Sequence, residues 1–450
     1  MLQAPRNAER EVSMLCPAEA TLVERERGLP GLGLLLDDAR FCERLAKLLP
    51  DRDVRAARGV YLRYKPRTSC LVSYRVLCRD GEVDVHALAR RSGAQKLEKA
   101  RRSAGRHDRP RLFVLEDDAI VIAMFPEDNE LRVLARLIEP STGRKLLAKL
   151  LGRDRGVDGA LVGVRYKPER RWVGRLGPDA GPTAVVKAYA RAGLEAALRG
   201  SRAWIDRPPL RVARLLGALP EHGLIALEWI AGRALGEALR EGQAGACEVA
   251  LAGEALACVH GQPASGLPIE GPSAQARRVL SAAAAVRFVQ PELSARAARL
   301  ARVVSDRLAA QGVAVVSTHG DFHAGQVLLT DGAAAVIDFD EAALGAPASD
   351  LASFLAHLEW QAGAGPRSAS QKEGLGQALL EGYARRAPIP SSGELALNTA
   401  AALFRIAPHF FRDRDPAWPE RTEAVLDRIE SLLGGRTARA TAPAIAERPA

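Results

Sequence analysis

The chain contains little cysteine, and its six cysteines do not form the pattern of a metal or redox site. They are scattered, with no CxxC pair and no histidine at the spacing of a zinc ligand. We therefore expect small buried thiols in a reducing compartment. No apolar run reaches membrane-spanning length, and the first residues lack a signal-peptide core. These absences exclude a disulfide scaffold and predict a soluble, cytoplasmic protein without a membrane partner.

Signs of nucleic-acid binding are also missing, since basic and aromatic residues are not interleaved and no helix-turn-helix pattern is present. The chain is nevertheless basic, with 64 Lys and Arg against 54 Asp and Glu, a net charge of +10. Such a surface favours small anionic partners as well as large ones, so no nucleic-acid partner is predicted. With 450 residues, 47% of them apolar, the chain is long enough for two or three domains.

The chemistry is concentrated in residues 318–355, which read THGDFHAGQVLLTDGAAAVIDFDEAALGAPASDLASFL. The segment opens with a His-Gly-Asp motif ending at Asp321, and the amide Gln326 follows five residues later. Two short apolar strands then form a predicted hairpin that delivers Asp338. Two carboxylates and an amide held by rigid strands are ligands that suit Mg²⁺, with substrate phosphates completing its shell. Each motif alone is common in structural positions, but their order and spacing together indicate a kinase-type site.

The segment resembles the catalytic segment of the aminoglycoside phosphotransferase and choline kinase family of small-molecule kinases. That family carries HGDxHxxN followed by IDxxxxxxGxPxxDLA. The matching residues here are His319, Gly320, Asp321, His323, Ile337, Asp338, Gly345, Pro347, Asp350, Leu351 and Ala352. Gln326 stands where the family has Asn, and its longer stem alters the geometry of a metal ligand. The resemblance implies a protein-kinase-like, two-lobed α+β fold and phosphoryl transfer that uses ATP or GTP with Mg²⁺.

The resemblance also implies roles for these residues. Asp321 would orient an acceptor hydroxyl and take its proton, with His319 and His323 as further catalytic candidates. A histidine beside a catalytic loop is, however, as often a hydrogen-bonding scaffold as a participant. Asp338 and Gln326 would hold Mg²⁺ on the phosphates.

A repeat precedes this segment and indicates a tandem duplication. Leu45–Leu49 and Leu147–Leu151 both read LAKLL, and Arg63–Pro66 and Arg165–Pro168 both read RYKP. The two matches have the same offset, because 147 − 45 and 165 − 63 both equal 102. We therefore expect an extra N-terminal module that duplicates the small lobe of the kinase-like fold.

Only the second copy carries the features of a nucleotide-binding lobe. Its predicted order is three strands, a helix and two strands: 161–166, 171–176, 183–189, 192–204, 212–219 and 224–227. Lys187 lies in the third strand among Val residues, where its charge needs a partner such as a phosphate, unless the side chain reaches solvent. His86 takes this position in the first copy, and Asp128 aligns with Gly232. We therefore predict that the first copy is a degenerate module with a structural or regulatory role.

Further nucleotide-binding candidates follow from the resemblance. Glu195 is the acidic residue on the helix that would pair with Lys187. No glycine-rich loop joins the first two strands, and a basic turn with Lys167 and Arg170-Arg171 replaces it. These charges can hold phosphates or can simply be solvated.

The sequence from Gly223 to Leu235, GLIALEWIAGRAL, resembles the last small-lobe strand and hinge of the family. The adenine edge would there meet backbone groups near Glu228, Trp229 and Ile230. Trp229 is equally credible as a packing residue between the lobes.

The predicted domains are a lead-in at 1–40, a degenerate repeat at 41–141, a nucleotide-binding lobe at 142–240, a mostly helical catalytic lobe at 241–434 and a disordered tail at 435–450. Residues 32–36 would add a strand or cover an edge. The acceptor site of such kinases is usually built from the C-terminal helices, where Glu359, Trp360, His409 and Arg412 are candidates.

The predicted function is transfer of the γ-phosphate of ATP, or GTP, to a hydroxyl of a small molecule, namely an amino sugar, an amino alcohol or a sugar. Net basic charge mildly disfavours polycationic aminoglycosides, although the local charge of the pocket could reverse this preference. The alternative is a nucleotide-binding pseudokinase with a regulatory role, suggested by Gln326 and the missing glycine-rich loop. A protein kinase is disfavoured because no activation segment ends in Ala-Pro-Glu. The sequence leaves the oligomeric state open.

Overall fold

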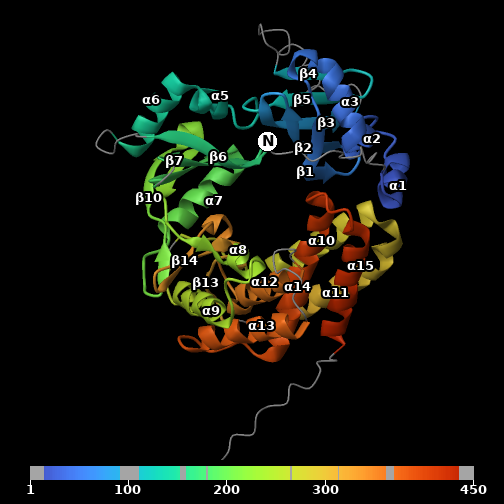
Figure 1. Cartoon of the computed structure of the whole chain (residues 1–450). Coiled ribbons are helices and arrows are strands. Elements are labelled where there is room, and N and C mark those ends of the chain that lie inside the picture. Colours follow the sequence, from blue (N-terminus) through green and yellow to red (C-terminus); the bar gives the residue numbers. More distant parts are fainter. Residues whose placement is uncertain are drawn as a thin grey trace, which may run out of the picture.

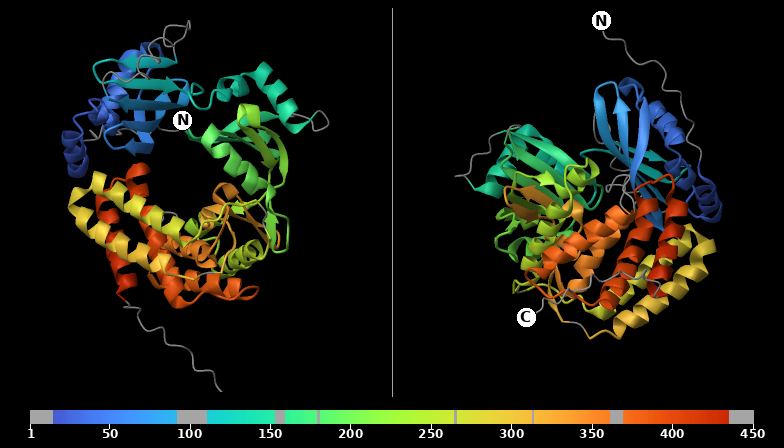
Figure 2. Two further views of the ribbon diagram at one scale, coloured as in Figure 1. Left: turned by 180° about the vertical axis from the view of Figure 1, so that it is seen from behind. Right: turned by 60° about the horizontal axis from the view of Figure 1, so that its bottom comes forward.

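Two antiparallel sheets and a mainly helical region surround a common cleft (Figures 1 and 2). The computed structural model describes residues 15–91, 111–152, 159–178, 181–263, 266–312, 314–360 and 369–434. The tail predicted to be disordered, 435–450, lies outside the described residues. Within them, no helix combines the length and the apolar character needed to span a membrane.

The N-terminal module is a five-stranded sheet in the order β1-β2-β3-β5-β4. Its elements are α1 (Pro17–Arg25), α2 (Leu32–Leu36), α3 (Asp38–Leu48), β1 (Ala56–Lys65), β2 (Ser69–Cys78), β3 (Gly81–Arg90), β4 (Leu112–Leu115) and β5 (Ile120–Met124). The predicted strand or edge cover at 32–36 is wrong, because this apolar run forms a helix that buries four of its five residues. The lead-in is thus part of the module, packed against its sheet.

The second module is also a five-stranded sheet, in the order β6-β7-β8-β11-β10. Its elements are α5 (Val133–Ile138), α6 (Pro140–Leu151), β6 (Ala160–Lys167), β7 (Arg171–Gly177), β8 (Ala184–Tyr189), α7 (Arg191–Arg202), β10 (Leu215–Leu219) and β11 (Leu224–Glu228). In both sheets the first three strands are neighbours, and the last strand of the module pairs with the third. This shared topology supports the duplication inferred from the repeated sequence.

The repeated RYKP segments form equivalent turns. Arg67 and Glu169, each the residue after the proline, have φ of +58° in the left-handed region. The next amide donates to the lysine carbonyl in both turns, from Thr68 to Lys65 at 3.0 Å and from Arg170 at 3.1 Å. A proline followed by a left-handed residue therefore closes the first hairpin of each module.

The remaining elements form the large lobe. They are β9 (Leu210–Val212), β12 (Arg233–Ala234), α8 (Leu235–Arg240), α9 (Ala246–His260), α10 (Pro272–Val289), α11 (Ser294–Ala309), β13 (Val316–Thr318), β14 (Val327–Thr330), β15 (Ala333–Val336), β16 (Ala343–Gly345), α12 (Pro347–Trp360), α13 (Ala369–Ala384), α14 (Ser392–Arg412) and α15 (Trp418–Leu433). The predicted strand at 212–219 is in fact divided, because β9 pairs in parallel with β15 and only β10 joins the small-lobe sheet. The predicted α+β, two-lobed fold class is confirmed.

One apolar core joins the N-terminal module to the C-terminal helices. Buried Tyr74 and Val85 of its sheet belong to the same cluster as Leu403 of α14 and Ile429 of α15. Figure 2 shows the module (blue) above these helices (red), while the second module (green) stands on the other side. The N-terminal module is therefore attached to the large lobe rather than stacked on its duplicate.

Candidate active site

The catalytic segment brings its polar residues to one wall of the cleft. Strand β13 leads into the loop that holds Asp321, and the β14–β15 hairpin places Gln326 at its start and Asp338 just beyond its end. The three side chains line one cleft of about 1130 Å³. The hairpin predicted from the apolar runs is confirmed, and it is what brings these residues together.

The loop requires glycine at position 320. Gly320 has φ of +84°, and a Cβ built on it would lie 2.1 Å from the carbonyl oxygen of Glu341. A side chain would therefore clash with backbone and strain the left-handed conformation. Close contact with the Asp338–Glu341 turn positions the loop.

A buried carboxylate braces the same loop. Asp350 of α12 accepts hydrogen bonds from the backbone N–H groups of His319 at 2.6 Å and Gly320 at 2.9 Å. His260 of α9 lies 3.1 Å from the carboxylate and 2.8 Å from the hydroxyl of Tyr383. Burial opposes ionisation of Asp350, but the hydrogen bond and charge of His260 outweigh it and hold the pKa below its usual range.

We expect Asp350→Asn to destabilise the fold by about 3–5 kcal/mol, because an amide group would face backbone donors in a buried site. Denaturant unfolding would measure this, with the exposed helix residue Asp306→Asn as the matched control. Because the folded-state pKa is lowered, the stabilisation is complete above about pH 4 and is lost as pH falls through the folded-state pKa. A loss below about 1 kcal/mol, or one that persists in acid, would contradict this role.

His319 positions the catalytic loop. It is fully buried, its Nε2 donates to the carbonyl of Ile337 at 2.9 Å, and its Nδ1 accepts from the N–H of Asp321 at 3.2 Å. Neither ring nitrogen is left for a substrate. His319 therefore fixes the loop in this structure, and its predicted catalytic role is not supported by these contacts and stays a prediction.

His323 lies at the cleft. Its Nδ1 accepts from the N–H of Gly325 at 3.0 Å, and its ring stacks on His357 with centroids 4.5 Å apart. Burial, followed by the neighbouring histidines, lowers the pKa of His323 to about 2. The neutral ring then carries its proton on Nε2 and can donate to a substrate, so its predicted catalytic role stays a prediction.

Asp338 is held between two cations. Lys187 Nζ lies 2.7 Å from its Oδ1, and Arg171 Nη1 lies 2.8 Å from the same oxygen. Burial opposes ionisation, but Lys187 and Arg171 outweigh it and keep the pKa of Asp338 well below its usual range. Asp338 also has φ of +67°, a strained conformation that is common at functional sites. The carboxylate is thus ionised and aimed by its surroundings.

The sequence reasoning did not identify Asp340, which completes this cluster. It accepts from Arg171 at 2.6 Å and from the hydroxyl of Tyr189 at about 3 Å, and it lies 3.7 Å from Lys187. Its position two residues after Asp338 is the sequence feature that could have indicated a second carboxylate in the site. The cluster therefore contains two carboxylates and two cations.

The residues present fit a magnesium ion. Gln326 Nε2 lies 3.5 Å from Asp338 Oδ2, so rotating the amide would direct its oxygen to the same place. Asp338, Asp340 and Gln326 then offer the hard oxygen donors that Mg²⁺ takes. Lys187 and Arg171 balance the charge of Asp338 in this structure, and a bound metal ion would contribute to the same neutralisation.

A model of the phosphotransferase enzyme family matches residues 154–389. The match spans 236 residues (389 − 154 + 1), more than half of the 450. This chain belongs to the phosphotransferase enzyme family. The family and the enzyme class predicted from the sequence are confirmed.

Solved structures with kinase activities are similar to this phosphotransferase at low identity. A choline/ethanolamine kinase family protein from Mesorhizobium loti is 19% identical, with 66% of this chain and 95% of that chain covered and a TM-score of 0.46. A choline kinase from Cryptosporidium parvum is 10% identical, with 66% and 97% covered and a TM-score of 0.46. Spectinomycin phosphotransferase, solved with ADP and spectinomycin, is 15% identical, with 64% and 97% covered and a TM-score of 0.45. No curated protein matched the chain by sequence.

The predicted pairing of Glu195 with Lys187 is wrong. Glu195 lies on the solvent face of α7, where its side chain is 86% exposed and pairs with Arg199 at 3.7 Å. Leu194, Ala197 and Gly200 are the buried residues by which the helix packs inward. In this phosphotransferase Asp338 takes the place of the helix carboxylate as the partner of Lys187.

The predicted hinge offers fewer backbone donors than expected. The N–H of Glu228 donates to the carbonyl of Arg214 at 2.9 Å, and that of Trp229 to the carbonyl of Thr183 at 3.2 Å. An adenine ring could not accept from these two groups. Ile230 is buried beside them, and the adenine contact stays a prediction for the remaining backbone groups.

The N-terminal module fixes the basic turn of the second module. Asp128 accepts from the hydroxyl of Tyr166 and the N–H of Glu169, both at 2.8 Å. Arg63 forms an ion pair with Glu169, and His86 lies against Tyr166. Asp128 therefore faces the duplicate lobe rather than a phosphate. These contacts support the structural role predicted for the first copy, and the alternative of a regulatory role stays a prediction.

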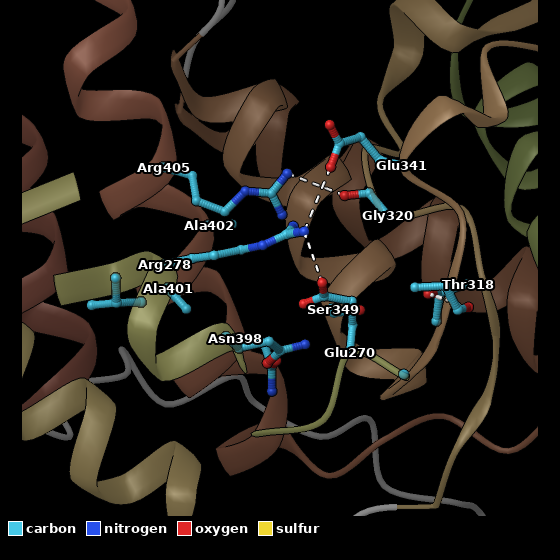
Figure 3. Close-up of a pocket in the computed structure, with 14 residues that line it drawn as sticks. Glu270, Arg278, Thr318, Gly320, Glu341, Ser349, Asn398, Ala401, Ala402 and Arg405 are labelled. Atoms are coloured by element: carbon cyan, nitrogen blue, oxygen red, sulfur yellow. Dashed lines mark hydrogen bonds and ion pairs between the residues drawn. The ribbon is translucent and has the colours of Figure 1, made fainter. Parts of the chain in front are cut away.

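Arg405 of α14 points toward Gly320 of the catalytic loop (Figure 3). Its guanidinium donates to the carbonyl of Gly320 at 3.1 Å and lies 3.5 Å from Asp321 Oδ1. Beside it, Arg278 pairs with Glu270 at 3.1 Å. Sequence reasoning missed Arg405, since nothing in its local pattern distinguishes it from the other arginines.

Proposed function

We propose that the protein transfers the γ-phosphate of ATP, or GTP, to a hydroxyl group of a small molecule. The observation that supports this best is the meeting of Asp321, Gln326 and Asp338 at one cleft within the family match, with buried Lys187 paired to Asp338. These residue types are the ones that phosphoryl transfer uses to position and to neutralise charge.

In the proposed reaction, Asp321 orients the acceptor hydroxyl. The hydroxyl oxygen attacks the γ-phosphorus, and the bond from this phosphorus to the β–γ bridging oxygen breaks. The electron pair leaves on the diphosphate, while the hydroxyl proton passes to the Asp321 carboxylate. Lys187 neutralises phosphate oxygens, and Asp338 with Gln326 would hold Mg²⁺, which supplies further charge neutralisation when bound.

Calorimetric titration of the full chain with Mg²⁺ and the non-hydrolysable analogue AMP-PNP should give one site per chain. We expect Lys187→Met to weaken binding by about tenfold to a hundredfold, since it removes a charged partner of the phosphates. The matched variant His86→Ala should leave the affinity within about twofold. Two sites, or loss of binding in a folded His86→Ala protein, would show that the N-terminal module also binds nucleotide.

A second candidate is a nucleotide-binding pseudokinase, and one observation favours it. Arg171 already bonds both Asp338 and Asp340, the carboxylates that a metal would need. Stabilisation by Mg–ATP without phosphotransfer to any hydroxyl acceptor would decide for the pseudokinase. Phosphotransfer catalysed by the unmodified chain would show that the protein is an enzyme.

A further inference from the structure

Part of the cleft is lined by cations that the proposed chemistry does not use. Besides the catalytic residues, the lining includes Arg165 and Lys167 of β6, Arg170 of the following turn and Arg412 of α14. The second module and the large lobe thus both contribute positive charge to the cleft that holds Asp321.

These cations differ from the others in the cleft in having no ion-pair partner. Arg171, Arg278 and Arg405 each lie within 4 Å of a carboxylate. Within the described residues, no carboxylate pairs with any of the following four: Arg165, Lys167, Arg170 and Arg412.

The surroundings of Lys167 indicate a local excess of positive charge. Burial, followed by the repulsion of Arg165, Arg171 and Arg170, lowers the pKa of Lys167 to about 8. Asp413, which also lines the cleft, opposes this shift and is close enough to interact with the charges of Arg165 and Arg412 as well, although it forms no ion pair with any of the three. A bound anion would relieve the repulsion.

The scaffold holds this charge in place. The Lys167 ammonium lies 5.7 Å from the ring centre of Tyr61 in β1, and Arg170 Nη1 lies 3.5 Å from the Tyr61 hydroxyl. Asp128 fixes the same turn through Tyr166 and Glu169. Contacts from the N-terminal module therefore keep the cations pointing into the cleft, which reduces the ordering cost of binding.

Neutral histidines lie near both Asp321 and these cations. Burial, followed by Arg412, lowers the pKa of His409 to about 3, and burial also lowers the pKa of His357. Both line the cleft with Asp321. Uncharged imidazoles can bind hydroxyl groups and do not repel a nearby anion in the way a carboxylate would.

We propose that the acceptor is a hydroxyl compound that also carries an oxyanion, bound by Arg165, Lys167 and Arg412 while its hydroxyl faces Asp321. This inference rests on the proposed phosphotransfer and narrows its substrate class. A phosphate ester and a carboxylate share the required chemistry. A polycationic acceptor would meet the same charges unfavourably.

The direct test uses inorganic phosphate as the probe on the full chain saturated with Mg–AMP-PNP. We expect one phosphate to bind per chain by calorimetry, and its affinity to fall by about tenfold to a hundredfold in Lys167→Gln and in Arg412→Gln. The control Arg299→Gln removes a surface arginine that pairs with Glu430, and it should change nothing. Circular dichroism would establish that each variant is folded.

Each outcome decides a question. If Mg–AMP-PNP itself does not bind, the proposed function fails. If Mg–AMP-PNP binds but phosphate does not bind to the complex, the acceptor inference fails. If Mg–AMP-PNP displaces phosphate from the chain, these cations bind the nucleotide, and the acceptor inference fails as well. Phosphotransfer assays with glucose 6-phosphate, gluconate, glucose and glucosamine then identify the source of the oxyanion. Preference for glucose or glucosamine would overturn the inference.

Discussion

Asp321→Asn should lower phosphotransfer by about 10²–10⁴-fold, while the fold and the nucleotide affinity stay nearly unchanged. The asparagine has almost the same shape but cannot accept the hydroxyl proton. Because Asp321 is partly exposed and makes one long contact with Arg405, its replacement should cost little stability. Steady-state rates and AMP-PNP titrations would measure the two effects separately.

The control for this experiment is Asp331→Asn, in the exposed β14–β15 turn. It changes a carboxylate of the same segment without touching the cleft, so its rate should be that of the unmodified chain. Full activity in a folded Asp321→Asn protein would disprove the assignment of Asp321 as the base.

Asp338→Asn should remove the dependence of nucleotide affinity on Mg²⁺. The neutral amide is a weaker metal ligand, and it leaves Lys187 and Arg171 with one carboxylate, Asp340, instead of two. We expect the ratio of AMP-PNP affinities with Mg²⁺ and with EDTA to fall from well above one to about one. Thermal unfolding of the variant would show how much stability is lost when Lys187 and Arg171 lack the charge of Asp338.

Arg171→Gln provides the opposite change at the same place. It removes a cation that competes with the metal for Asp338, so the Mg²⁺ dependence should be kept or increased. If Asp338→Asn retains the full Mg²⁺ effect, Asp338 is not a metal ligand. If Arg171→Gln loses it, the guanidinium is needed for metal-dependent binding instead of opposing it.

Local patterns predicted much of the fold and the catalytic segment. The β14–β15 hairpin forms where the two short apolar runs before Asp338 predicted it. The strands of the second module match to within a few residues, because alternating burial is a local property of a sheet. The strand predicted at 212–219 is right only in part. β10 (Leu215–Leu219) forms within it, but Val212 belongs to β9, which pairs with β15 more than a hundred residues away in the chain.

Side-chain partners were harder to predict. A helix carboxylate near Lys187 suggested Glu195, yet which face of α7 packs inward depends on the neighbouring elements. Gly200 of that helix lies so close to Phe339 that a Cβ would be 2.0 Å from its carbonyl oxygen. That contact brings the Asp338–Asp340 turn beneath the small lobe. The spacing of residues in the sequence does not predict a contact between segments so far apart in the chain.

By itself, the sequence determined the order of the catalytic loop and the hairpin with Asp338, and it predicted a duplication of the small module that the shared sheet topology supports. These features depend on residues that are close in the chain or on copies of the same pattern. The tertiary structure alone decided that Arg171 bonds Asp338 across 167 residues and that Asp128 supports the turn of the other copy. Such contacts join segments brought together by the packing of whole sheets and helices, and no local preference encodes them.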